Sequence, residues 1–472
     1  MKMTIQAPVS RQEHTLAHVV FISAAAALGG FLFGYDSAVI NGAVDGIKGH
    51  FHVGAGVTGL IVSSALLGSA VGAAVAGRLA DLRGRLIVMR LSALLFVISA
   101  VGSMFPFAEW ELAGWRIVGG IAIGMASVVS PTYIAEIAPP AYRGRLASFQ
   151  QLAIVLGIAI SQLVNFGIAS FAGGEVRGRL LGVEAWQWML GVAALPALVF
   201  LVVTLVIPES PRYLVANNRL KRARQVLAEV EGEHIDLDAR IEEIRGVLRS
   251  EHKPSVRDLR GPALGLLPIV WIGIALSVLQ QFVGINVIFY YSASLWHSVG
   301  ISQTNSLLIS LSTSIINILG TLIAIMFVDR IGRKPLALIG SVGMTISLAV
   351  MAWAFSAAHK TGGTDVHIPH SHGMVALVAA HTYVLFFALS WGVVVWVMLG
   401  EIFPNRVRAA AMAVAVAAQW IANWLVTVTF PSLSEWSLSG AYIGYSVFAL
   451  LSVFFVIRYL HETKGKRLEE MG

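Results

Sequence analysis

The 472-residue chain contains no cysteine, and only 12% of its residues are charged. Without cysteine it forms no disulfide bond and has no thiol chemistry. A soluble globular protein carries about 25% charged residues, so the low charge excludes an ordinary soluble domain. The sequence also has no nucleotide-binding loop, no metal-binding cluster and no nucleophile with a base at a usable spacing. We therefore predict that the protein is not an enzyme and has no catalytic residue, no cofactor and no metal site.

Hydrophobic residues, in contrast, make up 57% of the chain. They are grouped in windows of about twenty residues, a length of helix that crosses the roughly 30 Å hydrocarbon core of a bilayer. The pattern predicts an all-α membrane protein with twelve transmembrane helices in two six-helix bundles. The windows lie near residues 18–40, 57–77, 86–106, 112–134, 147–170, 188–207, 266–292, 303–327, 336–357, 376–400, 409–430 and 440–460.

The basic residues are concentrated in loops on one side of these helices, such as Arg83, Arg145 and Lys334. Cytoplasmic loops carry an excess of Lys and Arg, so this side and both chain ends are predicted to be cytoplasmic. The net charge of +7 therefore reflects topology and does not indicate a nucleic-acid partner. The predicted parts are a cytoplasmic N-terminus (1–17), an N-terminal bundle (18–207), a cytoplasmic linker with short amphipathic helices (208–262), a C-terminal bundle (263–460) and a cytoplasmic tail (461–472).

The two halves repeat the same motifs in corresponding cytoplasmic loops. Residues 81–85 read DLRGR and 329–333 read DRIGR, while EIAP at 136–139 matches EIFP at 401–404. A carboxylate at the C-terminal end of a helix is unfavourable, so each glutamate is expected to need an arginine partner. The alternative is that these arginines are ordinary topology signals. We predict a cytoplasmic gate of ion pairs formed by Arg85, Glu136, Arg143, Arg333, Glu401 and Arg408.

Two charged residues fall inside predicted membrane helices at a similar depth. Asp36 lies in the first window, and Arg116 lies near the external end of the fourth, which runs in the opposite direction. Intramembrane ionisable residues are costly and usually mark a pair or an ion pathway. A carboxylate beside an arginine can bind and release a proton if the pairing changes with conformation. A static salt bridge is the alternative.

Uncharged polar side chains gather in the second half, where residues 280–286 read QQFVGIN inside an apolar run. An unpaired amide in hydrocarbon costs several kcal/mol, so these side chains either join helices or form a polar pocket. Gly284 is a point at which the helix can bend. Amides and indoles without a charge suit a neutral polyol, and Tyr290 and Tyr291 would cover such a pocket. Other polar residues expected at mid-membrane are Gln151, Asn317, Trp391, Trp396, Gln419 and Asn423.

These motifs, together with GGFLFGYDSAVI at 29–40 and PESPRYL at 208–214, resemble the sugar porter family of the major facilitator superfamily along nearly the whole chain. The likeness is to bacterial proton-coupled xylose and glucose symporters. The resemblance implies the major facilitator fold, Asp36 as the proton-coupling acid with Arg116 as its partner, and an external gate at Tyr290 and Tyr291. The residues that it places against the sugar are Gln151, Gln280, Gln281, Asn286, Asn317, Trp396, Gln419 and Asn423.

The favoured function is a proton-coupled symporter that imports a monosaccharide, glucose or xylose, by alternating access. Ala193 stands where the bacterial xylose symporter has a second membrane carboxylate, so a passive facilitator with the same pocket is the alternative. A membrane sugar sensor and a drug or polyol exporter are the candidates from other classes. The predicted partners are the monosaccharide, a proton and the lipid of a bacterial inner membrane, with the protein working as a monomer.

Overall fold

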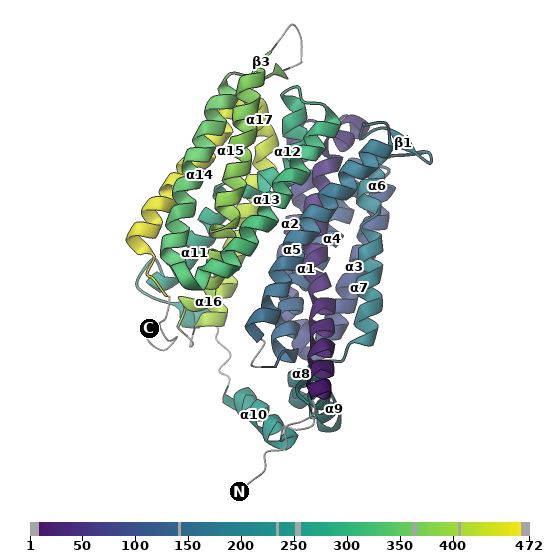
Figure 1. Cartoon of the computed structure of the whole chain (residues 1–472), viewed down its shortest axis with the longest axis vertical. Helices are drawn as coiled ribbons and strands as arrows, with labels where there is room; N and C mark the ends of the chain where they lie inside the picture. Colours follow the sequence, from purple (N-terminus) through teal and green to yellow (C-terminus); the bar gives the residue numbers. More distant parts are fainter. Residues whose placement is uncertain are drawn as a thin grey trace.

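The computed structural model describes residues 9–139, 143–232, 236–250, 256–360, 366–404 and 407–463. Figure 1 shows two bundles of helices side by side, one from each half of the chain, with short helices of the segment between the halves at one end of the molecule. We call this end the linker side and the opposite end the distal side. Within the described ranges, eleven helical segments are long and apolar enough to cross a membrane.

The N-terminal bundle contains six passes, as predicted. The sixth follows a short β-hairpin, where Glu184 caps the helix and its backbone N–H donates to Gln187 Oε1 at 3.2 Å. This pass is interrupted between Gly191 and Ala194. The elements are α1 (Val9–Phe51), α2 (Ala55–Arg83), α3 (Arg85–Met104), α4 (Glu109–Ile137), α5 (Arg143–Phe171), β1 (Arg179–Leu180), β2 (Val183–Glu184), α6 (Ala185–Gly191) and α7 (Ala194–Val206).

The linker forms amphipathic helices, as its mixed charge and helical periodicity predict. One face of the second linker helix buries Val226, Leu227 and Val230, while its charged residues are mostly exposed. The elements are α8 (Pro211–Ala216), α9 (Leu220–Glu231), α10 (Leu237–Ser250) and a 3-10 helix, η1 (Val256–Leu259).

The C-terminal bundle has two passes that are broken in the middle, one at Gly284 and one near Ser390. The sequence predicted each of them as a single window. The elements are α11 (Pro268–Phe282), α12 (Ile285–Ser298), α13 (Gln303–Ile331), α14 (Arg333–Ser356), β3 (His359–Lys360), β4 (Val366–His367), α15 (His370–Ala388), α16 (Trp391–Glu401) and α17 (Arg408–Tyr459).

The last helix, α17, contains both of the final predicted passes. Its backbone is non-helical at Ser437, where φ is −162° and ψ is 107°. Beyond this residue the chain runs back along α14, because Ser439 donates to Ala352 O at 2.7 Å and Ser452 donates to Ser341 Oγ at 2.8 Å. The eleven apolar segments therefore contain the twelve passes that the sequence predicts.

Small residues allow α2 and α4 to pack with their backbones in contact, the usual means of helix association in membranes. A Cβ on Gly120 would overlap the carbonyl oxygen of Ala65. Gly114, in the same helix, has no neighbouring atom within 4 Å of such a Cβ. These two glycines thus form a matched pair, one at a close contact and one in open space.

We expect Gly120→Ala to destabilise the protein by about 1–3 kcal/mol, the usual cost of overpacking a close contact. Gly114→Ala should be neutral or slightly stabilising, because alanine is the better helix former. Thermal unfolding of both variants in the same detergent measures the difference. Equal melting temperatures would contradict this account of the α2–α4 contact.

Candidate functional site

The seventh pass is broken at Gly284, which has a left-handed φ of 84°. This conformation is strained for residues with a side chain. α11 ends at Phe282 and α12 begins at Ile285. The hydroxyl of Tyr383 donates to the carbonyl oxygen of Val283 at 2.7 Å and thereby satisfies a backbone group at the break. The break leaves amide side chains on both of its sides free to meet.

Four of the predicted amides form one hydrogen-bonded group, which we call the amide cluster: Gln280, Gln281, Asn286 and Gln419. Gln280 Oε1 accepts from Gln281 Nε2 at 3.2 Å and from Gln419 Nε2 at 2.5 Å, while its own amide donates to Trp391 O at 2.9 Å. Asn286 Nδ2 donates to Gln281 Oε1 at 2.5 Å. Gln419 Oε1 is buried and accepts no hydrogen bond from the residues that the structure describes, so the cluster retains an acceptor for a hydroxyl group.

The other predicted sugar-binding residues are not hydrogen-bonded to the amide cluster within the described part of the chain. Asn423 is 7% exposed, and its Oδ1 accepts from Thr427 Oγ1 at 3.1 Å. Asn317 on α13 is also buried, and Gln151 on α5 is half-buried. Trp396 on α16 is 43% exposed, so the structure presents its ring to an open surface or space. Gln151 is the one N-terminal-bundle member of the predicted set.

Asp36 and Arg116, which the sequence placed at one depth, are paired in the N-terminal bundle. Arg116 Nη1 lies 3.3 Å from Asp36 Oδ2 and 3.2 Å from Asp36 O. Asp36 is 6% exposed and Arg116 is 2% exposed. Arg116 Nε is buried and has no hydrogen-bond partner in the described part of the chain. The pair is therefore a desolvated ion pair whose cation is only partly satisfied, and a protonation of Asp36 would leave that cation without a counter-charge.

The family described as Sugar (and other) transporter matches residues 22–472 of this chain. The chain belongs to this sugar transporter family. Members of the family are transporters rather than enzymes, so the predicted absence of enzymatic activity is confirmed by this membership. The polar groups in the middle of the bundles are thus those of a membrane transporter.

Similar proteins span the full length of this family member. The glucose transport protein of Synechocystis sp. is 51% identical over 98% of this chain and 100% of the relative. The D-xylose-proton symporter of Escherichia coli K12 is 37% identical over 97% of this chain and 96% of the relative. The inward-open structure of the E. coli xylose transporter XylE superposes with a TM-score of 0.81 at 35% identity, covering 96% and 99% of the two chains.

On the linker side of the transporter, Arg85 holds one of the predicted glutamates by a bidentate ion pair. Its Nε and Nη2 each lie 2.8 Å from Glu136, and Ser210 donates to the same carboxylate at 2.5 Å. Glu209 caps α3, since the backbone N–H groups of Arg85 and Leu86 donate to it at 3.1 and 3.3 Å. Burial raises the pKa of the Glu209 carboxyl, against the lowering effect of these backbone donors.

The C-terminal bundle repeats this cluster residue for residue. Arg333 Nε and Nη2 lie 3.1 and 2.8 Å from Glu401, and Thr463 donates to Glu401 at 2.5 Å. Glu462 accepts from the backbone N–H groups of Arg333 and Lys334 at 3.1 and 3.0 Å. The sequence repeat thus corresponds to two equivalent sites related by the parallel repeat of the fold.

Each linker-side cluster joins helix ends within one bundle. Arg408 donates through Nε to Phe403 O at 3.1 Å, and its Nη2 has no hydrogen-bond partner among the described residues. The side chain of Arg143 lies outside the part of the chain that the structure describes. The clusters therefore tie together the ends of the helices in each half, and a role in gating stays a prediction.

On the distal side, hydrogen bonds cross directly from α1 to α12. Asn41 Oδ1 accepts from the backbone N–H of Ala293 at 2.9 Å. Asp45 Oδ1 accepts from Ser294 Oγ at 2.6 Å, and Asp45 Oδ2 lies 2.9 Å from His297 Nδ1. We call these five residues the distal latch. The distal latch is not among the predicted sites, although Asn41 and Asp45 are four residues apart and thus share one face of a helix.

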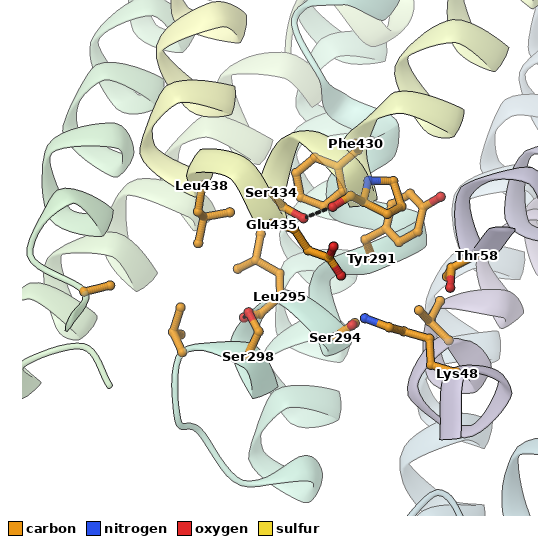
Figure 2. A pocket seen from close by; sticks show the side chains of 14 residues that line it. Lys48, Thr58, Tyr291, Ser294, Leu295, Ser298, Phe430, Ser434, Glu435 and Leu438 are labelled. Carbon is orange, nitrogen blue, oxygen red and sulfur yellow. Dashed lines mark hydrogen bonds between the residues drawn. The ribbon is translucent and has the colours of Figure 1, made fainter. Parts of the chain in front are cut away.

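A cavity of about 270 Å³ opens beside the distal latch, between the two bundles. In Figure 2, the side chains of Lys48 from α1 and Glu435 from α17 point into it. Tyr291 and Phe430 form an aromatic wall, with ring centroids 5.3 Å apart. The remaining lining residues are Val44, Thr58, Ser294, Leu295, Ser298, Val299, Ala358, Pro431, Ser434 and Leu438.

Tyr291 connects this distal cavity to the polar centre of the transporter. Its hydroxyl donates to Thr427 O at 2.8 Å, and the Thr427 side chain donates to Asn423. No member of the amide cluster is among the residues lining the cavity. Tyr291 is 2% exposed and Tyr290 is 7% exposed, so both tyrosines are buried, and Tyr291 is the one of the two that lines the cavity.

Replacing Asp45 by asparagine should loosen the distal latch. A hydrogen bond to a charged group is worth about 1.5–3 kcal/mol, so its loss should make opening at least about tenfold more frequent. Because the chain has no cysteine, Ser298→Cys provides a single label site in the cavity, and its rate of reaction with a maleimide reports opening. Asp238→Asn, at an exposed ion pair with Arg224, is the control. Equal rates for both variants would argue against the latch.

Proposed function

We propose that this chain is a proton-coupled symporter that imports a monosaccharide, glucose or xylose, by alternating access. One observation carries the proposal: one bundle holds a buried carboxylate–arginine pair, and the other holds a cluster of uncharged amides. Relatives named as a glucose transport protein, a D-xylose-proton symporter and an arabinose-proton symporter of Bacillus subtilis support it. The amides suit hydroxyl groups, and the acid suits a proton.

Asp36 is the group that takes up the proton in this proposal. Leaving one partner of a buried ion pair unpaired costs about 3–5 kcal/mol, so protonation of Asp36 creates a strong drive for Arg116 to rearrange. Both residues lie in the N-terminal bundle, on α1 and α4. The free energy released when Arg116 finds a new partner can favour the inward-facing state of the transporter with sugar and proton bound.

The sugar binds at the interface between the bundles. Amide donors and acceptors meet the hydroxyl groups, and the Trp396 ring packs against the C–H face of the sugar. The proposed sugar-binding residues are Gln151, Gln280, Gln281, Asn286, Asn317, Trp396, Gln419 and Asn423.

The linker side is proposed to be cytoplasmic, because the basic loops lie there, and the distal side external. Both termini are then cytoplasmic, in a bacterial inner membrane. Tyr290, Tyr291 and the distal latch close the external side, and similarity to the inward-open xylose transporter supports this state. The linker-side clusters, with Arg143 and Arg408, close the cytoplasmic side when the bundles rock together. We further propose that the transporter works as a monomer, with the five parts bounded at residues 17, 207, 262 and 460.

A passive facilitator with the same pocket is the second candidate. The observation in its favour is Ala193, an apolar residue that is 5% exposed at the break between α6 and α7. The relatives that are named proton symporters favour coupling over this alternative.

Uptake of radiolabelled glucose and xylose into proteoliposomes, with and without an inward proton gradient, tests the proposal. Symport predicts accumulation above the outside concentration that collapses when an uncoupler is added. Uptake that only equilibrates, and that ignores the gradient, would establish the passive facilitator instead.

A further inference from the structure

The distal cavity lies between the two bundles and has the dimensions of a ligand site. Its volume of about 270 Å³ is close to the lower end of the range for small-molecule sites, which begins at about 300 Å³. Val44, Lys48 and Thr58 line it from the N-terminal bundle, and its other lining residues belong to the C-terminal bundle. A ligand in this cavity therefore lies against both bundles at once.

The cavity receives one positive and one negative side chain, each from a different bundle. Lys48 is on α1 and Glu435 is on α17, and both side chains point into the cavity (Figure 2). Neither forms an ion pair or a side-chain hydrogen bond with another residue that the structure describes. The ammonium group of Lys48 can therefore donate to a ligand, and the carboxylate of Glu435 can accept from it. A hydroxyl group, which both donates and accepts, suits this combination.

The aromatic wall supplies the apolar part of the site. The rings of Tyr291 and Phe430 are tilted by 39° to each other, with centroids 5.3 Å apart. Aromatic surface packs against the C–H face of a sugar ring. Ser294, Ser298 and Ser434 add hydroxyl oxygens to the lining. Charged groups beside an aromatic wall suit a molecule with hydroxyl groups at its edge and an apolar face, and a monosaccharide is such a molecule.

The cavity adjoins the contacts that close the distal side. Tyr291, a residue of the predicted external gate, lines it, and Ser294 both lines it and donates to Asp45 of the distal latch at 2.6 Å. A further bond joins the bundles on this side, because Thr304 Oγ1 donates to Gly174 O at 3.2 Å. A sugar that approaches from the distal side therefore meets the cavity while the way to the amide cluster is closed.

We propose that the distal cavity is an entry site that binds a free monosaccharide while the distal side is closed, an inference that rests on the proposed sugar transport. Lys48 donates to one hydroxyl group of the sugar and Glu435 accepts from another. When the bundles part on the distal side, these two side chains move apart and the sugar loses one of them. The bound sugar therefore favours the closed state, and a high external sugar concentration slows its own uptake.

Protection of a cysteine in the cavity tests for the site. Ser298→Cys places a single thiol among the lining residues of a chain without cysteine, and its reaction with a maleimide is followed in the purified full-length protein. A small ligand held by few bonds binds in the millimolar range. With a Kd of about 10 mM, D-glucose or D-xylose at about 100 mM should slow the labelling about tenfold. Glycine betaine at the same concentration should not slow it.

Three further changes in the Ser298→Cys protein locate the bound sugar. Glu435→Ala should weaken the protection about tenfold, the value of one hydrogen bond to a charged group. Glu175→Ala is the matched control, because Glu175 is an exposed acid on the distal side that does not line the cavity. The double change of Gln281 and Asn286 to alanine, which disables the proposed central site, should leave the protection intact.

Uptake by intact cells, in which sugar reaches the protein from the external side, measures the consequence for transport. The initial rate for the wild type should pass through a maximum and fall at the concentrations that protect the cysteine. The rate for Glu435→Ala should rise to a plateau, and Glu175→Ala should behave as the wild type does. A plateau for the wild type would show that the bound sugar does not hold the distal side closed, which contradicts the inference.

The labelling has two further outcomes against the inference. Protection that survives Glu435→Ala, or none in any variant, would show that the cavity holds only solvent. Protection that disappears with Gln281 and Asn286 would show that sugar acts on the thiol from the central site. A protein that shows the expected protection but never accumulates sugar in proteoliposomes would refute the proposed symport and leave the entry site standing.

Discussion

Replacing Asp36 by asparagine should abolish the uphill accumulation of sugar while still allowing it to equilibrate. The buried carboxyl is the group proposed to take up the coupling proton, and asparagine mimics its protonated form without releasing a proton. One proton per sugar supplies about 1.36 kcal/mol per pH unit, so the wild type can accumulate sugar up to about tenfold across a one-unit gradient. The ratio for the variant should be about one.

Radiolabelled uptake into proteoliposomes at equal protein density measures this ratio. Asp238→Asn is the control, since Asp238 belongs to an exposed ion pair of the linker. This variant should accumulate sugar as the wild type does. Accumulation by Asp36→Asn at the wild-type level would show that the Asp36–Arg116 pair is only structural.

The double substitution Gln281→Ala and Asn286→Ala should have the largest effect on sugar binding. Asn286 donates to Gln281, and Gln281 donates to Gln280, so the change removes two of the four members of the amide cluster. Each hydrogen bond lost to a ligand, with its partner left unpaired, costs about 1–3 kcal/mol. The dissociation constant for glucose or xylose should therefore rise at least about tenfold, and by more than a hundredfold if both amides contact the sugar.

Equilibrium binding to purified protein measures this loss. Gln303→Ala provides a matched control, because Gln303 is a buried amide at the start of α13 whose Nε2 has no hydrogen-bond partner within the described ranges. Its removal should leave the affinity within about twofold of the wild type. A double variant with wild-type affinity would show that the amide cluster only joins helices and does not bind the sugar.

The sequence was sufficient to predict the transmembrane passes, because the length of a hydrophobic run determines whether a segment can cross a bilayer. It did not reveal that one non-helical residue, Ser437, separates the last two passes, since a single such residue carries no compositional signal. The break at Gly284 was visible as a glycine among amides, but its left-handed φ depends on packing around the bend. Tertiary contacts determine where a helix breaks and which backbone conformation it takes there, and sequence periodicity does not encode these contacts.

The same limit applies to the site. Asp36 and Arg116 stood out because charge in hydrocarbon is rare, and the structure places them in contact. The distal latch was missed because Asp45 lies close to the predicted end of an apolar window, where a charged residue is ordinary. Its partners Ser294 and His297 are equally ordinary at a helix end. The paired glutamate clusters were predictable from the sequence only as a repeat of two motifs. The structure shows that each arginine–glutamate pair forms within its own bundle.

Direct detection of proton movement is the most decisive test of the whole account. Proteoliposomes that contain a pH-sensitive dye, with no imposed proton gradient, receive a pulse of glucose or xylose outside. The account predicts acidification of the lumen as sugar flows inward, with one proton per sugar, and no pH change with Asp36→Asn. Sugar uptake at the wild-type rate without any change in lumenal pH would contradict symport and identify this member of the family as a passive facilitator.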